Sequence, residues 1–186
     1  METTAQRSYV KESARVISSI DSEKVGRIGL MMAERLKRGG KPIVMGNGGS
    51  AAEAQHFVAE VMGRFEKERS PMPAIALTTN SSNITAIGND YSYDEIFARQ
   101  LKGLCKGSPN DVVVGMSTSG NSKNVVRALE EANSLNLLTV GMVGKKGKIK
   151  EMCKEVLEVD SERTSHIQEA HLAMIHMLSK IIGDST

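Results

Sequence analysis

Two short loops of small residues each follow an apolar run and precede a helical pattern. The first loop is Gly46–Ser50, with the sequence GNGGS, and the second is Ser117–Ser122, with the sequence STSGNS. The free backbone N–H groups and the positive dipole at a helix start can bind an anion at each loop. The hydroxyl groups of the second loop add further donors. Two such loops in one small protein indicate a phosphorylated ligand that is held at both ends.

Neither loop matches the known nucleotide fingerprints. The GNGGS loop lacks the GxGxxG spacing, no acidic residue stands where a ribose would be bound, and the lysine pattern of the P-loop is absent. The STSGNS loop is moderately specific for phosphate. A serine-rich turn without a ligand is its simpler alternative.

His56 and Glu60 lie four residues apart in the helical pattern that follows the first loop. Residues at this spacing share one face of a helix. Such a pair can bind a divalent metal ion, or it can hold a general base beside the group that orients it. An exposed pair without a function is the alternative, but a position two turns beyond a ligand loop favours a site.

The other three histidines, His166, His171 and His176, lie in the last helical pattern. A step of five residues turns the helix by about 140°, so the three cannot face one way. We expect one or two of them at most to serve a site, and the rest to be surface or interface groups. Gln168 and His176 are about 80° apart around the helix and about 12 Å apart along it. A helix bend, or side chains from two subunits, would help both to reach one metal ion, which points to a site at an interface.

The elements that must position these residues alternate between short apolar runs and helical patterns after Pro42. This alternation predicts right-handed βαβ units and a parallel sheet. Strands that are apolar throughout predict a sheet covered on both faces, which gives a three-layer α/β/α sandwich. The five expected strands are 43–45, 74–77, 111–116, 137–142 and 156–159, and the expected helices are near 50–62, 83–88, 93–104, 122–135, 147–154 and 164–182.

Ligands of parallel sheets bind beyond the carboxyl ends of the strands. Both small-residue loops lie there, and so does Gly88–Tyr91, which we expect to be an irregular segment between two helices. Taken alone, this segment is better interpreted as a simple turn. The first forty residues predict two further helices, the second of which ends at Gly39–Gly40. They form either an N-terminal helical arm that packs partly against another subunit or a plain covering layer.

The composition limits the function classes. A chain of 186 residues predicts one domain, 1–186, with helices over 1–40 and an α/β core over 41–186. A net charge of +2, an aromatic share of 3% and the lack of Trp argue against a nucleic-acid partner. Cys105 and Cys153 match no metal spacing and predict free thiols. Without an apolar signal or a bilayer-length apolar run, we expect a cytoplasmic protein with no membrane partner.

Taken together, these residues give a sequence that resembles the sugar isomerase (SIS) domain family and, within it, the phosphoheptose isomerases. The likeness covers nearly the whole chain, and the combination of its segments is highly specific. The segments are GNGGSAAEAQHFVAE (46–60), GRF (63–65), PAIAL (73–77), AIGND (86–90), STSGNS (117–122) and RTSHIQEAH (163–171).

The resemblance implies a flavodoxin-like or Rossmann-like SIS fold and a homotetramer whose active sites lie between subunits. It implies isomerisation of sedoheptulose 7-phosphate to D-glycero-D-manno-heptose 7-phosphate. It also implies one Zn²⁺ ion per subunit. By position, the zinc ligands would be His56, Glu60, Gln168 and His176. The phosphate would be held by Ser117, Thr118, Ser119 and Ser122. The sugar would be contacted by Asn47, Gly48, Gly49, Glu60, Asn89, Asp90 and Gln168.

The chemistry of the implied reaction explains these residue types. Moving a carbonyl group from C2 to C1 takes a proton from one carbon and returns it to the other through an enediol. A carboxylate suits the carbon-bound proton, an imidazole can move protons between the oxygens, and zinc would polarise the carbonyl. We therefore assign Glu60 as the base and His176 as its partner acid. How each divides its role between metal binding and proton transfer stays open.

Two other functions stay open at this point. Non-enzymatic SIS-domain relatives that regulate the bacterial replication initiator protein lack the carboxylate at Glu60 and the histidine at His176, and both are present here. A sugar-phosphate sensor would bind the ligand without turnover. Ser165 stands where some relatives carry an acidic residue. If that acid helps catalysis in those relatives, its role is missing here or falls to Asp90 or Glu169.

Overall fold

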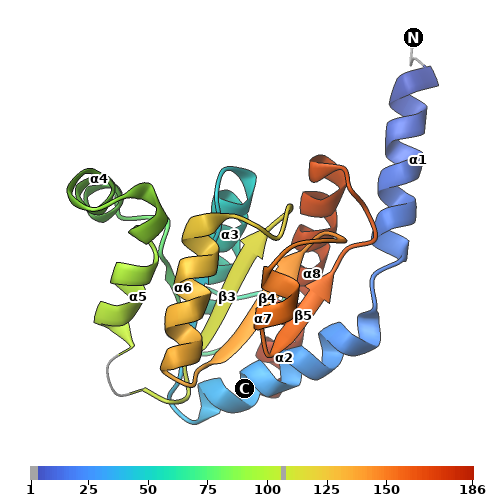
Figure 1. Ribbon diagram of the computed structural model, residues 1–186. Helices are drawn as coiled ribbons and strands as arrows, with labels where there is room; N and C mark the ends of the chain where they lie inside the picture. Colours follow the sequence, from blue (N-terminus) through green and yellow to red (C-terminus); the bar gives the residue numbers. More distant parts are fainter. Residues whose placement is uncertain (1–3, 106–107) are drawn as a thin grey trace.

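A computed structural model describes residues 4–105 and 108–186, and its centre is a five-stranded parallel sheet in the order β2-β1-β3-β4-β5. The strands are β1 (Pro42–Met45), β2 (Ile75–Ala76), β3 (Val112–Ser117), β4 (Leu138–Val143) and β5 (Glu155–Glu158). The helices are α1 (Thr4–Ser18), α2 (Ser22–Lys37), α3 (Gly49–Met62), α4 (Ser81–Asp90), the 3-10 helix η1 (Tyr93–Glu95), α5 (Ala98–Leu104), α6 (Lys123–Ser134), α7 (Ile149–Met152) and α8 (Thr164–Ser185). Helices lie on both faces of the sheet (Figure 1), which confirms the predicted three-layer α/β/α fold.

The apolar runs of the strands supply both faces of the sheet. In β1 and β3, Val44 and Val114 belong to the core beneath α2, α3 and α8, whereas Ile43 and Val113 belong to the core beneath α5, α6 and α7. Successive residues of a strand point to opposite faces, so a strand between two helical layers must be apolar throughout. Every residue of β3 and β4 is accordingly buried.

The direction of the strand order reverses between β1 and β3. From β1 the chain moves to β2 on one side, then crosses to β3 on the other side and continues outward through β4 and β5. Met45 at the end of β1 pairs with Gly115 of β3, so the two loops begin at nearly the same level. A reversal of this kind opens a ligand crevice at the carboxyl ends of the strands. The fold therefore brings the two predicted anion loops, Gly46–Ser50 and Ser117–Ser122, to one place.

Two predicted segments differ from the structure. Gly88, Asn89 and Asp90 form the last turn of α4 rather than an irregular segment. The helix continues to Asp90, and the N–H of its C-cap residue Tyr91 donates to the carbonyl oxygen of Ile87 at 3.0 Å. The predicted helix over 93–104 is divided into η1 and α5. Between them lie Ile96 and Phe97, which are both buried in the core.

The two N-terminal helices have different surroundings. The apolar stripe of α2 is buried in the core against α8 and consists of Val25, Ile28, Met32 and Leu36. In contrast, α1 extends beyond the rest of the molecule (Figure 1), and Val16 is its one buried side chain among those that the structure describes. Val10 and Ile17 of α1 are exposed. The helix α2 is thus a covering layer of this chain, while packing of α1 against another subunit stays a prediction.

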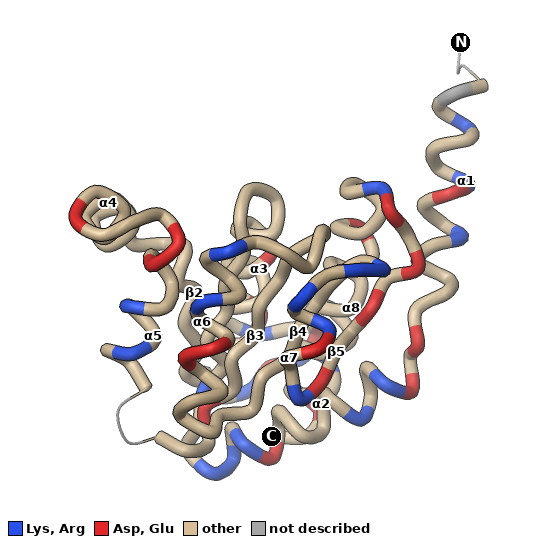
Figure 2. The backbone as a smooth tube through the Cα atoms, in the orientation of Figure 1, with Lys and Arg blue, Asp and Glu red and all other residues tan. Residues whose placement is uncertain are grey.

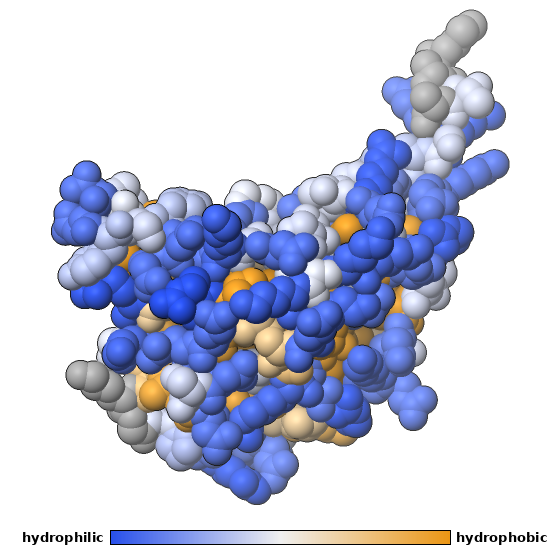
Figure 3. All heavy atoms as spheres, in the orientation of Figure 1, coloured by the Kyte–Doolittle hydropathy of each residue, from blue (hydrophilic) through white to orange (hydrophobic). Residues whose placement is uncertain are grey.

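The surface carries mixed charge. Figure 2 shows acidic and basic residues interspersed along the outer helices and loops. The face drawn in Figure 3 is mostly hydrophilic, with small hydrophobic patches between the charged side chains. Within residues 4–105 and 108–186, none of the helices has the length and apolar character that crossing a bilayer requires.

Candidate functional site

A cavity of about 460 Å³ lies where the loops after β1 and β3 meet the first turns of α8. Most of its wall comes from residues that the sequence predicted to hold the phosphate or the sugar. Its lining consists of Asn47, Gly48, Gly49, Ser50, Met116, Ser117, Thr118, Ser122, Thr164 and Gln168. The structure therefore joins the two loops into one site, with α3 and α8 both beginning at its wall.

The hydroxyl groups of the second loop are gathered at the start of α6. The Oγ atoms of Ser117 and Ser122 are 2.9 Å apart, those of Ser117 and Ser119 are 3.4 Å apart, and Ser122 is the N-cap residue of α6. A helix start that carries several hydroxyls offers both backbone and side-chain donors to one anion. Ser117, Thr118 and Ser122 face the cavity, whereas Ser119 lines a neighbouring hollow of about 270 Å³.

Glycine at position 49 allows α8 to reach the first loop. A Cβ atom on Gly49 would lie 2.4 Å from Nε2 of Gln168, so the Gln168 amide could not keep its present position. The absence of a side chain thus lets the Gln168 amide enter the cavity beside Gly48 and Gly49. Gln168 is in place for the predicted contact with a sugar ligand.

Two glycines hold the second loop against the loop that follows β4. Gly120 and Gly147 have φ angles of 66° and 117°, and a Cβ atom on Gly147 would lie 2.4 Å from the Cα of Gly120. The N–H of Ile149 donates to the carbonyl oxygen of Gly120 at 3.0 Å. The loop that presents the hydroxyls is therefore supported from behind by backbone, which fixes its shape.

His56, Glu60 and His176 form a compact group between α3 and α8. The Nε2 atom of His56 lies 3.1 Å from Nε2 of His176 and 3.1 Å from Oε1 of Glu60. One ligand atom from each of the three residues can be chosen so that all lie within 4.8 Å of one another. All three are partly exposed, so an ion or a ligand can reach them.

This group fits a zinc ion. Two histidines and one glutamate are the protein ligands of one common type of catalytic zinc site, which keeps a position open for substrate. Ligand atoms on a tetrahedral zinc at 2.0–2.1 Å lie about 3.3 Å apart, close to the 3.1 Å that separates His56 from each of the other two residues. The ligand atoms of Glu60 and His176 lie within 4.8 Å of each other. In the part of the chain that the structure describes, the three residues form the one cluster of His, Cys, Asp or Glu that could hold a metal ion.

Gln168 lies elsewhere in this chain than the other three predicted ligands. It contacts Gly49 in the cavity, about 12 Å along α8 from His176. For Gln168 to join the other three residues on one metal ion, it would have to come from a second copy of the chain, or its side chain would have to take a different position. Its role as a metal ligand stays a prediction.

The segment after α3 covers the histidine–glutamate group, which the sequence analysis did not foresee. The ring of Phe65 stacks on the imidazole of His176, with centroids 5.5 Å apart. The guanidinium of Arg69 donates to the carbonyl oxygens of Glu60 and Val61 at 2.7 and 2.8 Å. These bonds satisfy carbonyls in the last turn of α3, which would otherwise lack partners. The segment thereby fixes the helix end that carries Glu60.

Asn89 and Asp90 are not brought to the cavity. They lie exposed at the end of α4, at the edge of the molecule (Figure 1), and the Asn89 amide donates to Oδ1 of Asp90 at 2.9 Å. Neither residue lines the cavity of this chain. Their contact with a sugar stays a prediction that a neighbouring subunit would have to fulfil.

The expectation that the remaining histidines are surface or interface groups is wrong, because His166 and His171 are completely buried. Nδ1 of His171 lies 4.0 Å from Oε2 of Glu53, a residue of α3 that the sequence analysis missed. Burial lowers the pKa of His171 to about 4 and raises the pKa of Glu53 to about 7, although a hydrogen bond from Ser50 partly offsets the second shift. His171 is therefore neutral near pH 7, and Glu53 keeps its proton to a higher pH than an exposed glutamate does.

Glu169 is one of the two residues that could take the role of the acid that some relatives carry at position 165. Its carboxylate faces α1. The hydroxyl groups of Tyr9 and Ser13 donate to its two carboxylate oxygens. The ring of Tyr9 also packs against His166, with centroids 4.6 Å apart. This carboxylate holds α1 onto α8 and does not line the cavity.

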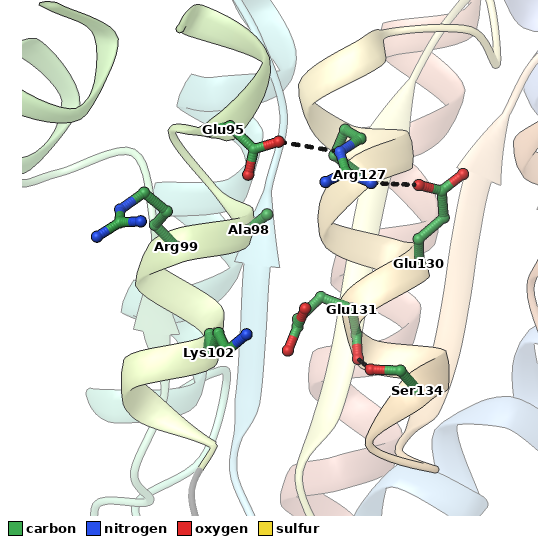
Figure 4. Close-up of a pocket in the computed structure, with 8 residues that line it drawn as sticks. All are labelled: Glu95, Ala98, Arg99, Lys102, Arg127, Glu130, Glu131 and Ser134. Carbon is green, nitrogen blue, oxygen red and sulfur yellow. Dashed lines mark hydrogen bonds and ion pairs between the residues drawn. The ribbon is translucent and has the colours of Figure 1, made fainter. Parts of the chain in front are cut away.

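A second hollow, of about 310 Å³, lies between α5 and α6 (Figure 4). Its charged side chains largely neutralise one another, since Arg127 is 3.0 Å from Glu95 and 3.1 Å from Glu130. It has no loop of glycines and hydroxyls. We therefore place the functional site at the first cavity.

Known proteins resemble the chain over nearly its whole length. The SIS domain family matches residues 8–144. A probable phosphoheptose isomerase from Thermoplasma acidophilum is 50% identical over 96% of this chain and 97% of the relative. Phosphoheptose isomerase 1 from Campylobacter jejuni is 47% identical, with 90% of each chain covered. The solved structure of a phosphoheptose isomerase from Neisseria gonorrhoeae shares 39% identity and a TM-score of 0.89 and covers 99% of this chain and 100% of its own. The chain belongs to the SIS domain family and, within it, to the phosphoheptose isomerases.

Proposed function

We propose that the cavity binds sedoheptulose 7-phosphate and that the chain isomerises it to D-glycero-D-manno-heptose 7-phosphate through an enediol. The chain is an isomerase of the phosphoheptose type, with a function in heptose biosynthesis. The observation that carries the proposed site is that α3 and α8 serve both of its parts. Their first turns line the cavity, and their later turns bring His56, Glu60 and His176 together.

The phosphate end of the substrate is assigned to the second loop. The hydroxyls of Ser117, Thr118 and Ser122 and the free N–H groups at the start of α6 are the donors that a phosphate dianion requires. Ser119 completes the set from the rim. The sugar is assigned to Asn47, Gly48, Gly49 and Gln168, with Asn89 and Asp90 supplied by another subunit.

The proton transfers are assigned to Glu60 and His176. Glu60 removes a proton from C1 and returns it to C2, while His176 moves a proton from O1 to O2. The 2.7 Å bond from Arg69 to the Glu60 carbonyl and the stacking of Phe65 on His176 keep both groups in place. Zn²⁺ held by His56, Glu60 and His176, with Gln168 as a fourth ligand, would polarise the substrate carbonyl.

The proposal includes a homotetramer with active sites between subunits. It is supported by the exposed Val10 and Ile17 of the projecting α1, and by the separation of Asn89 and Asp90 from the cavity of their own chain. Chemical cross-linking and light scattering would measure the assembly directly. A chain that stays monomeric while it is active would contradict this part of the proposal.

The test mixes the purified chain with sedoheptulose 7-phosphate and follows the aldose product by NMR. The assay is run as purified, after treatment with a chelator, and after zinc is added back. We expect turnover, its loss on chelation and its recovery with zinc. Glu60→Gln should abolish turnover yet leave assembly and phosphate binding intact. No product under any condition would overturn the proposal.

The same assay separates the two alternatives. Binding of the sugar phosphate without turnover would indicate a sensor. Absence of both binding and turnover would agree with a regulator of the replication initiator, which the similarity to phosphoheptose isomerases does not favour.

A further inference from the structure

A buried amide joins the two loops of the cavity. Asn124, the second residue of α6, is 2% exposed and faces Asn47 of the first loop. The Nδ2 of Asn47 donates to Oδ1 of Asn124 at 2.8 Å, and the Nδ2 of Asn124 donates to Oδ1 of Asn47 at 2.9 Å. Among the hydrogen bonds of residues 4–105 and 108–186, these are the two that join the first loop to α6, the helix that continues the second loop.

The direction of this amide pair is fixed by the backbone. The N–H of Val125 donates to Oδ1 of Asn124 at 2.9 Å, and a backbone N–H can only face an acceptor. This bond decides which atom of the Asn124 amide is oxygen. Because the pairing is reciprocal, it also decides the orientation of the Asn47 amide.

A count of hydrogen-bonding groups then shows what Asn47 can offer a ligand. Its Oδ1 accepts from Asn124 and from the Tyr93 hydroxyl at 3.2 Å, so both lone pairs are occupied. Its Nδ2 carries two hydrogens, and one of them is donated to Asn124. In the Asn47 side chain, one N–H donor therefore remains free for a ligand, and no acceptor remains free.

We propose that Asn124 is a positioning residue that acts through Asn47. It makes Asn47 present a single N–H donor to a sugar oxygen, and it ties the sugar loop to the start of α6, where the phosphate is held. The inference rests on the proposed function, since it concerns how the two ends of the same sugar phosphate are aligned.

The test is a double-mutant cycle of Asn124→Ala and Asn47→Ala. Asn124→Ala removes both hydrogen bonds to Asn47 and places no charge beside the phosphate loop. We expect kcat/KM for sedoheptulose 7-phosphate to fall about tenfold or more. The affinity for inorganic phosphate, measured by competition, should change less than about twofold, because the second loop keeps its donors.

The cycle decides between positioning and a merely structural role. If Asn124 acts through Asn47, Asn124→Ala should have little further effect on kcat/KM once Asn47 is alanine. An equal loss in both backgrounds would overturn the proposal, and so would an unchanged kcat/KM for Asn124→Ala alone. If Asn124→Ala does not fold, as judged by circular dichroism, the cycle is repeated with Asn124→Ser, which likewise introduces no charge.

Failure of the proposed function would look different. A wild-type chain without turnover refutes the isomerase assignment, and the same cycle is then measured on the Kd for sedoheptulose 7-phosphate by calorimetry. Additive losses in that Kd would overturn the role of Asn124, whereas non-additive losses would support it.

Discussion

The ring of Phe65 lies nearly parallel to the imidazole of His176, with the two planes inclined by 12° and the centroids 5.5 Å apart. Phe65 belongs to the segment that follows α3, and His176 belongs to α8. The contact therefore joins the end of one helix of the site to the middle of the other. It gives His176 a fixed ring orientation, which both metal binding and proton transfer require.

Phe65→Ala should leave the imidazole of His176 free to rotate. We expect kcat/KM to fall about three- to tenfold, because one aromatic contact is worth about 0.5–1.5 kcal/mol beyond its buried area. Phe65→Tyr keeps the ring and serves as the control. Steady-state kinetics of the three proteins decide the matter, and equal rates for the wild type and Phe65→Ala would refute an orienting role.

Ser119→Ala removes an exposed hydroxyl from the rim of the phosphate loop. The effect should appear chiefly in substrate affinity, with KM raised about ten- to a hundredfold and kcat little changed, because a hydrogen bond to a charged ligand contributes about 1.5–3 kcal/mol. Inhibition by inorganic phosphate should weaken in parallel. An unchanged KM would remove Ser119 from the phosphate site.

Gly147→Ala should disturb the phosphate loop from behind. The new Cβ would lie 2.4 Å from the Cα of Gly120, so one of the two loops must move. We expect weaker phosphate binding and a free energy of unfolding lower by about 1–3 kcal/mol. Gly26→Ala in α2 is the matched control, since a Cβ there meets nothing within 4 Å. Equal melting temperatures and phosphate affinities for the two variants would contradict the prediction.

Glu53→Gln should stabilise the chain in a pH-dependent way. The pKa of Glu53 is raised from 4.5 to about 7 by burial, so between these values the unfolded chain loses this proton and the folded chain keeps it. Stability contributed by the group therefore falls as the pH rises through this range. The variant should gain roughly 1–3 kcal/mol near pH 8 and little near pH 4. Urea unfolding at both pH values measures this, and a gain that does not depend on pH would exclude titration of Glu53 as its cause.

Local sequence patterns predicted the frame of the site. The runs of β3 and β4 are largely apolar, and the GNGGS and STSGNS loops follow the first and third strands, so the sheet and the cavity could be anticipated. The spacing of His56 and Glu60 also sufficed, because one helix fixes their relation. In each case the relevant residues are neighbours along the chain.

Contacts between distant segments could not be anticipated in the same way. Nothing in the spacing of Glu53 and His171 indicates that they meet between α3 and α8, and the pairing of Asn47 with Asn124 spans two layers of the fold. Phe65 and Arg69 reach the site only because the segment after α3 turns back over α8. Such residues carry no local period, and only the packing of the folded chain brings them together.

The helices that continue the two loops lie on opposite faces of the sheet, α3 on one face and α6 on the other. A sugar phosphate that touches both loops therefore connects the two outer layers of the sandwich. Binding to the folded state lowers the population of every partly opened state in which either layer has separated. We expect ligand to slow amide hydrogen exchange on both faces together, so that the bound protein opens as one cooperative unit while the free protein can open one layer at a time.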